Sequence, residues 1–135
     1  HCGPVVRKEG ERWSFVAAGP TTSAREEPYQ AKVIESYAVR GVIGKGGMGP
    51  ATLEACRRFG AVYFHAVGGC GTSIAQSVKE VLAVHKLEEF GTPEAFWVTR
   101  VEDFPVIVTM DSHGNSIHDA VRAASKKVYD ELMRG

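Results

Sequence analysis

The order of apolar and polar residues along the 135-residue chain predicts strands and helices that alternate through most of its length. Short apolar runs rich in β-branched residues and closed by glycine or proline are typical of strands. They occur at 13–18, 41–43, 61–67, 81–84, 95–101 and 105–110. Helices are expected where apolar residues recur every three or four positions. These segments are 30–38, 50–60, a short one through 75 and 78, and one that begins after 115.

A helix that begins at Pro50 and ends at Gly60 separates the runs 41–43 and 61–67. A crossover helix between consecutive strands implies a parallel pair with a right-handed connection. The run 81–84 is expected to extend this parallel sheet. The centre of the fold is therefore predicted to be parallel.

The two runs 95–101 and 105–110 are separated by only three residues, too few for a helix. They are expected either to pair antiparallel or to lie in a second sheet. The final segment places apolar residues on one face and charged residues elsewhere, which predicts a surface helix. Residues 1–135 are interpreted as a single α/β domain with a parallel core and some antiparallel pairing.

Composition and charge exclude several classes of protein. Apolar residues make up 44% and charged residues 24%, as in ordinary globular domains. Sixteen basic and sixteen acidic residues give zero net charge and form no basic stripe, so a nucleic-acid partner is not expected. No apolar run approaches the roughly 18–20 residues that cross a bilayer, and the first residues lack the features of a signal peptide. No membrane partner and a cytoplasmic location are therefore expected.

The cysteines Cys2, Cys56 and Cys70 are odd in number and form no CxxC pair, so free thiols are expected. His113 and His118, together with Asp111 and Asp119, suggest a metal site at first. A turn followed by a helix cap explains the same residues and is the preferred interpretation.

Three glycine-containing loops follow predicted strands, at 19–25, 44–48 and 68–73. Ligands of parallel sheets collect beyond the carboxyl ends of the strands, where helix N-termini favour anions. The first two loops each carry one long cation, Arg25 and Lys45, which suits a small dianion such as a dicarboxylate. Nucleotides and phosphosugars use similar loops, although the spacing of neither the Walker A nor the Rossmann motif is present.

The run Gly19-Pro20-Thr21-Thr22-Ser23-Ala24-Arg25 resembles the GPTT-x-x-R motif of the β-type component of class I fumarases and L-tartrate dehydratases. Gly44-Lys45-Gly46-Gly47-Met48 is similar to the next motif of that family. The similarity continues through 93–97, 101–105, Asp111 and 114–115, so it covers nearly the whole chain.

The resemblance implies a swivelling β/β/α domain of three layers, in which a parallel sheet accompanies a smaller antiparallel sheet and helices. It also implies an α-type partner subunit that holds a [4Fe–4S] cluster, whereas this chain would bind no metal. The active site would form where the two components meet, and contacts between β-type components are possible.

The implied reaction is reversible hydration of fumarate to malate, as in the tricarboxylic acid cycle, or dehydration of tartrate to oxaloacetate. The resemblance assigns Thr21 as the base and Arg25 and Lys45 as contacts of the substrate carboxylates. Thr22 and Gly46, in the same motifs, are also expected to bind substrate. Alternatively, Thr21 only donates a hydrogen bond or caps a helix, and the whole chain is a non-catalytic anion-binding module.

Two departures from the family pattern bear on the site. Glu26 and Glu27 follow Arg25, where the family usually has methionine first, and this places negative charge beside an anion site. An Arg-Asp-x-x-His motif that precedes the first loop in the family is not found. Either the chain is truncated or the arginine of that motif comes from elsewhere.

Overall fold

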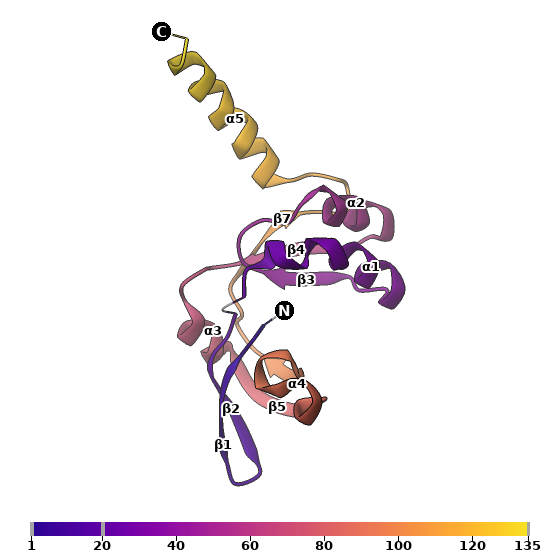
Figure 1. Cartoon of the computed structure of the whole chain (residues 1–135), viewed down its shortest axis with the longest axis vertical. Helices are drawn as coiled ribbons and strands as arrows, with labels where there is room; N and C mark the ends of the chain where they lie inside the picture. Colours follow the sequence, from indigo (N-terminus) through magenta and orange to yellow (C-terminus); the bar gives the residue numbers. More distant parts are fainter. Residues whose placement is uncertain (1, 20, 135) are drawn as a thin grey trace.

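The upper half of the body in Figure 1 is a three-stranded sheet covered by two helices. The computed structural model describes residues 2–19 and 21–134. In this half β3 (Gly41–Gly44) pairs parallel with β4 (Val62–Ala66), and β7 (Val106–Met110) pairs antiparallel with the other edge of β4. The predicted parallel pair is confirmed, and it is joined by α2 (Pro50–Phe59).

Helix α1 (Glu27–Tyr37) packs against α2 and with it covers the sheet. Proline occupies the first turn of each helix, where the missing N–H costs nothing. Helix α2 ends at Gly60, whose φ of +68° is a left-handed conformation that favours glycine. A core cluster holds these elements together, with members Ile34, Ala55, Cys56 and Ala61.

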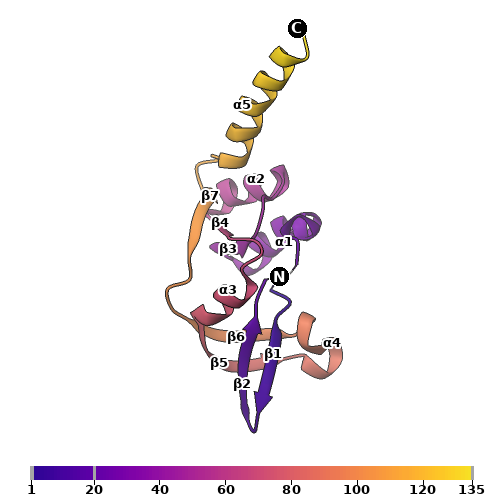
Figure 2. The ribbon, with the colours of Figure 1, turned by 90° about the vertical axis from the view of Figure 1, so that its left-hand side faces the viewer.

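The lower half consists of two antiparallel hairpins that cross each other, as Figure 2 shows. One hairpin is β1 (Val5–Glu9) with β2 (Arg12–Ala17), and the other is β5 (Val78–His85) with β6 (Phe96–Val101). Helix α4 (Leu87–Glu94) connects β5 to β6, and the short helix α3 (Gly71–Ser77) precedes β5.

The expectation that run 81–84 extends the parallel sheet is wrong. This run belongs to β5, which pairs with β6 in a separate sheet. Helix α3 ends at Ser77 and β5 begins at the next residue. No connecting segment is left between them that could bring the chain back beside β4 as a further parallel strand. Strand β7 pairs with that edge of β4 instead. The runs 95–101 and 105–110 therefore lie in separate sheets, which was the second of the two alternatives expected for them.

A second core cluster joins the two halves. Ala18 follows β2, Ala66 ends β4, and Ile74 lies on α3, and the partly buried Phe15 and Phe104 pack against them. The α/β class is confirmed, and among the described residues parallel pairing is confined to β3 and β4 while the other strand pairs are antiparallel. The three glycine-containing loops lie at this junction.

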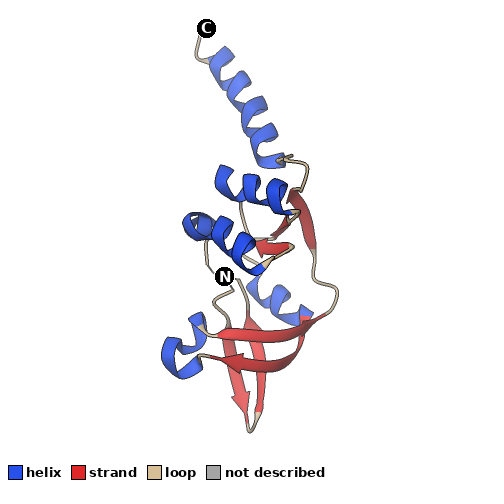
Figure 3. Ribbon diagram, turned by 90° about the vertical axis from the view of Figure 1, so that its right-hand side faces the viewer, coloured by secondary structure: helices blue, strands red, loops and turns tan. Residues whose placement is uncertain are grey.

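The predicted C-terminal helix is present as α5 (Ile117–Leu132), which projects from the body beyond β7 (Figure 3). Its N-terminus is capped by the Ser116 side chain, which accepts from the N–H of Asp119 at 3.2 Å. None of its residues is buried. Within residues 2–19 and 21–134 no helix has the length and apolar character needed to cross a membrane.

Candidate active site

The structure brings the three predicted loops together. The backbone N–H of Ala18 donates to the carbonyl oxygen of Gly71 at 3.0 Å, which joins the first loop to the third. A Cβ atom built on Gly68 would lie 3.8 Å from Cδ of Lys45, so the third loop also borders the second. The loops therefore form one continuous surface.

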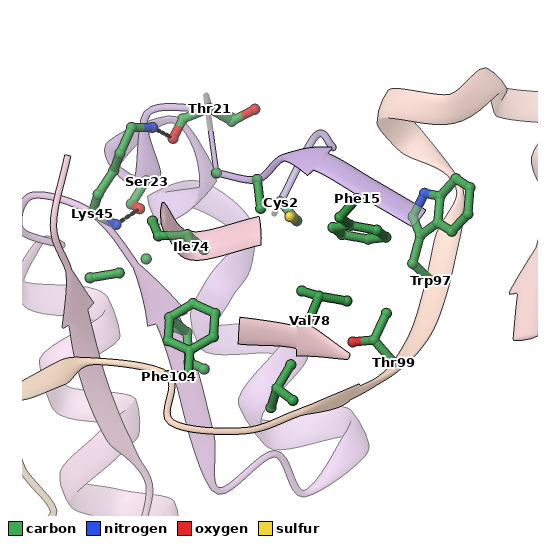
Figure 4. A pocket seen from close by; sticks show the side chains of 16 residues that line it. Cys2, Phe15, Thr21, Ser23, Lys45, Ile74, Val78, Trp97, Thr99 and Phe104 are labelled. Atoms are coloured by element: carbon green, nitrogen blue, oxygen red, sulfur yellow. Dashed lines mark hydrogen bonds between the residues drawn. The ribbon is translucent and has the colours of Figure 1, made fainter. Parts of the chain in front are cut away.

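Lys45 makes the direct connection between the first two loops. Its backbone N–H donates to Oγ of Ser23 at 2.8 Å, and its Nζ donates to the backbone carbonyl oxygen of Thr21. Figure 4 shows both hydrogen bonds at one end of a pocket. The ammonium charge of Lys45 thus lies beside the residue for which the base role was predicted.

The pocket is a cavity of about 340 Å³ at the junction of the two halves. Thr21, Ser23 and Lys45 form its polar end, and Cys2 and Thr99 add further polar atoms. The remaining walls are mainly apolar and include Phe15, Ile43, Ile74, Val78, Trp97, Val101 and Phe104. Trp97 is fixed by edge-to-face contacts with Trp13 and Phe15, at centroid distances of 5.3 and 5.6 Å. The ammonium group of Lys45 and two of the hydroxyl-bearing residues, Thr21 and Ser23, are therefore grouped at one end of the cavity.

The other predicted site residues lie outside the cavity lining. Arg25 lies on a single 3₁₀ turn, Ser23–Glu26, with an exposed side chain, and Thr22 just before that turn is also exposed. Gly46 has a φ of +72°, and a Cβ built there would meet no atom within 4 Å. Glycine at 46 is therefore required by the backbone conformation and not by a close neighbour.

Glu27 occupies the N-terminus of α2, which was expected to attract an external anion. Its carboxylate accepts from the backbone N–H groups of Gly49, Ala51 and Thr52 at 2.7, 3.0 and 3.2 Å. The hydroxyl of Thr52, which is fully buried, donates to Glu27 at 2.6 Å. The negative charge of Glu27, one of the two that seemed to oppose an anion site, is thus directed into α2, where the helix dipole stabilises it.

Ser23 and Tyr63 belong to the site, although neither was among the residues predicted for it. Tyr63 is fully buried in β4, and its hydroxyl donates to the carbonyl oxygen of Gly46 at 3.2 Å. Burial raises the pKa of Tyr63, and a hydrogen bond with Ser23 partly opposes this rise. A tyrosine inside a buried strand was the available signal, because a buried phenol needs a hydrogen-bond partner.

All three cysteines are free thiols, as predicted. Burial raises the pKa of both Cys2 and Cys56, which disfavours the thiolate that a metal requires. Among the residues that the structure describes, no three His, Cys, Asp or Glu side chains are grouped so as to hold a metal ion. The described cysteines are therefore not grouped as ligands of an iron–sulfur cluster, whose irons take mainly cysteine thiolates.

The alternative metal cluster near residue 113 is a turn, as preferred from the sequence. The Asp111 carboxylate accepts from the backbone N–H groups of His113 and Asn115, each at 2.9 Å. His118 turns the other way and stacks on His65 of β4, with ring centroids 5.7 Å apart.

Comparison with known proteins identifies the family of the chain. Residues 1–121 match the family model described as "Fumarase C-terminus". The chain is 51% identical over 126 residues to a protein of Geobacillus stearothermophilus named "Putative fumarate hydratase class I", covering 93% of this chain and 24% of that protein. It is 45% identical over 132 residues to the L(+)-tartrate dehydratase subunit beta of Escherichia coli (strain K12), covering 97% of this chain and 63% of the subunit.

The fold and the loop site thus define an α/β domain with a small polar site at the meeting point of its two halves. The chain belongs to the fumarase C-terminus family. It spans about a quarter of the Geobacillus relative and less than two thirds of the Escherichia coli subunit.

Proposed function

We propose that this chain is the β component of a hydro-lyase that reversibly hydrates fumarate to malate in the cytoplasm. It would supply the base and the carboxylate-binding wall of an active site completed by an α-type subunit. The observation that supports this most directly is the hydrogen bond from Lys45 Nζ to the Thr21 carbonyl oxygen at the polar end of the cavity. Membership of the fumarase C-terminus family supplies the reaction class.

In the proposed reaction the hard step is removal of a proton from the carbon next to a carboxylate. That step needs a positioned base and stabilisation of the charge that develops on the carboxylate. Thr21 would accept the proton, and the adjacent Lys45 ammonium would favour the anionic form of the hydroxyl. Lys45 and the exposed Arg25 are the cations that would hold the two substrate carboxylates. Thr22 and Gly46 would contact the substrate from the same two loops.

The [4Fe–4S] cluster of this enzyme type would be held entirely by the α-type subunit. The scattered thiols of this chain and the raised pKa of Cys2 and Cys56 support this division. The exposed position of Arg25 agrees with a site that closes against a second surface. Contacts between two β components are compatible with this arrangement.

Dehydration of L(+)-tartrate is the second candidate, because the Escherichia coli relative matched over 97% of this chain carries that name. The two substrates differ in hydroxyl groups, and a site built to bind a hydroxyl discriminates strongly against a ligand that lacks it. Comparing kcat/KM for both substrates would separate the candidates.

The test of the proposal is anaerobic reconstitution with the α-type subunit, followed by assay of fumarate hydration and tartrate dehydration. Lys45→Ala should abolish turnover while the chain stays folded, whereas Lys32→Ala, an exposed lysine on α1, should leave turnover unchanged. Full turnover in Lys45→Ala would reject the site. A wild-type complex inactive on both substrates, in which the chain still binds dicarboxylates, would favour the non-catalytic module.

A further inference from the structure

Tyr63 is the only fully buried tyrosine among the residues that the structure describes, and its hydroxyl lies beneath the second loop. On β4 it pairs in register with Val42 of β3 on one side and Met110 of β7 on the other. Because the backbone of Tyr63 is paired on both sides and its side chain is fully buried, the ring has little freedom to move. Its hydroxyl donates to the carbonyl oxygen of Gly46, immediately after Lys45.

Ser23 completes the contact from the first loop. Its Oγ accepts the backbone N–H of Lys45 at 2.8 Å and is also hydrogen-bonded to Tyr63. The two hydroxyls therefore hold the backbone on both sides of Lys45. One comes from the sheet and the other from the loop that carries Thr21.

The backbone of Gly44 lies directly against these hydroxyls. A Cβ atom built on Gly44 would lie 2.3 Å from Oγ of Ser23 and 2.5 Å from the hydroxyl of Tyr63. Real Cβ atoms do not approach so closely, so only glycine lets the loop reach this position. The glycine before Lys45 and the two hydroxyls thus form one packed unit.

We propose that Tyr63 and Ser23 are positioning residues, which fix the loop so that the Lys45 ammonium lies beside Thr21. The inference rests on the proposed function, since it gives these residues a part in the same reaction. Tyr63 is fully buried and acts through Lys45 without touching substrate. The phenol of Tyr63, whose ordinary pKa of 10.0 is raised further by burial, stays protonated at neutral pH and remains a donor to Gly46.

The test uses Tyr63→Phe and Ser23→Ala in the complex with the α-type subunit, with Tyr37→Phe as the matched control. Tyr37 is 78% exposed at the end of α1, so its hydroxyl serves no comparable contact. Displacement of a catalytic group by about 1 Å lowers turnover as much as 100-fold, so kcat should fall about 10- to 100-fold in both variants. KM should change less, and Ser23→Thr, which keeps a hydroxyl, should retain most of kcat.

A second measurement does not depend on turnover. Hydrogen exchange of the Lys45 amide should be about tenfold faster in Ser23→Ala, because its acceptor is removed, and unchanged in Tyr37→Phe. Faster exchange together with lowered kcat supports the proposal. Unchanged exchange, or a wild-type kcat in both variants, would overturn it even if the variants melt at lower temperature.

Different results would overturn the proposed function and the positioning role of Tyr63. An inactive wild-type complex would overturn the proposed function and with it any catalytic part for Tyr63. An active wild-type complex that is inactivated by Lys45→Ala but unaffected by Tyr63→Phe would overturn only the positioning role.

Discussion

Glu27 and Thr52 are joined by a 2.6 Å hydrogen bond that connects the first turn of α1 to the first turn of α2. The same carboxylate accepts three backbone N–H groups, including that of Gly49 just before α2. A Cβ atom on Gly49 would lie 2.6 Å from this carboxylate, which explains glycine at that position. Glu27, which follows the first loop, thus fixes the end of the second loop.

Replacement of Glu27 by alanine should therefore destabilise the chain. It removes the partner of the buried Thr52 hydroxyl and of the N-terminal amides of α2. Loss of a helix cap costs about 0.5–2 kcal/mol, and an unsatisfied buried group about 1–3 kcal/mol. We expect the free energy of unfolding in urea to fall by about 2–3 kcal/mol.

The matched control is Glu35→Ala, an exposed glutamate on the same helix, which should change the free energy of unfolding by less than about 0.5 kcal/mol. The free energy of unfolding of Glu27→Gln should lie between those of Glu27→Ala and Glu35→Ala, because glutamine keeps an acceptor and loses the charge. Equal stability of Glu27→Ala and the wild type would show that water replaces the carboxylate without cost.

Gly44 and Gly46 should respond differently to the same substitution. Gly44→Ala places a Cβ atom within 2.5 Å of two hydroxyls, and overpacking of this kind costs about 1–3 kcal/mol. Gly46→Ala meets open space and pays only for its φ of +72°, about 1 kcal/mol. Urea unfolding of both variants measures the difference.

A double variant tests whether the strain at Gly44 arises from the Tyr63 hydroxyl. In a Tyr63→Phe background one of the two close contacts disappears, so Gly44→Ala should cost less there than in the wild type. An identical cost in both backgrounds would mean that the strain lies elsewhere.

The parts of the fold that were predicted correctly are those set by local pattern. Pro50 and Gly60 delimit α2, and the crossover they bound dictates a parallel pair, so the loops after β3 and β4 were expected at one edge. Lys45 was identified for that reason. The relation of Lys45 to Thr21 follows once the first loop is brought to the same edge.

The parts that were missed depend on contacts between distant residues. The β5–β6 hairpin is held against β1–β2 by Trp97, which packs on Trp13 and Phe15, and no local pattern reports such a contact. The role of Tyr63 likewise depends on where the second loop crosses β4. Strand β1 was missed because its second half, residues 7–9, is entirely charged and lacks alternation.

The role of the Thr21 hydroxyl can be tested separately from that of the Thr21 backbone carbonyl. Lys45 Nζ donates to the Thr21 carbonyl oxygen, which every substitution preserves. Thr21→Ser should therefore keep much of the turnover of the reconstituted complex. Thr21→Ala should lose about 10²–10⁴-fold in kcat, the usual contribution of a general base.

A loss in Thr21→Ala confined to KM would instead indicate that the hydroxyl only binds substrate. The exposed Thr72 on α3 provides the control, since Thr72→Ala removes a hydroxyl outside the cavity lining. Its kcat should equal that of the wild type.

Asp111 should make the stability of the chain depend on pH at the acidic end. Hydrogen bonds from Asn115 and from the backbone N–H of His113 hold the pKa of Asp111 below its ordinary value of 3.8. A carboxylate with a lowered pKa in the folded state stabilises the fold at pH values above 3.8. This stabilisation is lost as the pH falls from 3.8 through the folded-state pKa, where the folded chain also takes up the proton.

Melting temperatures measured from pH 6 down to about pH 2.5 would test this linkage. In Asp111→Ala the melting temperature should be lower at pH 6, and the difference from the wild type should shrink as the pH falls below 3.8. Asp111→Asn, which keeps an acceptor but carries no charge, should show the same convergence, because the stabilisation depends on the ionised carboxylate. A difference that stays constant with pH would mean that Asp111 contributes through its turn geometry and not through its charge.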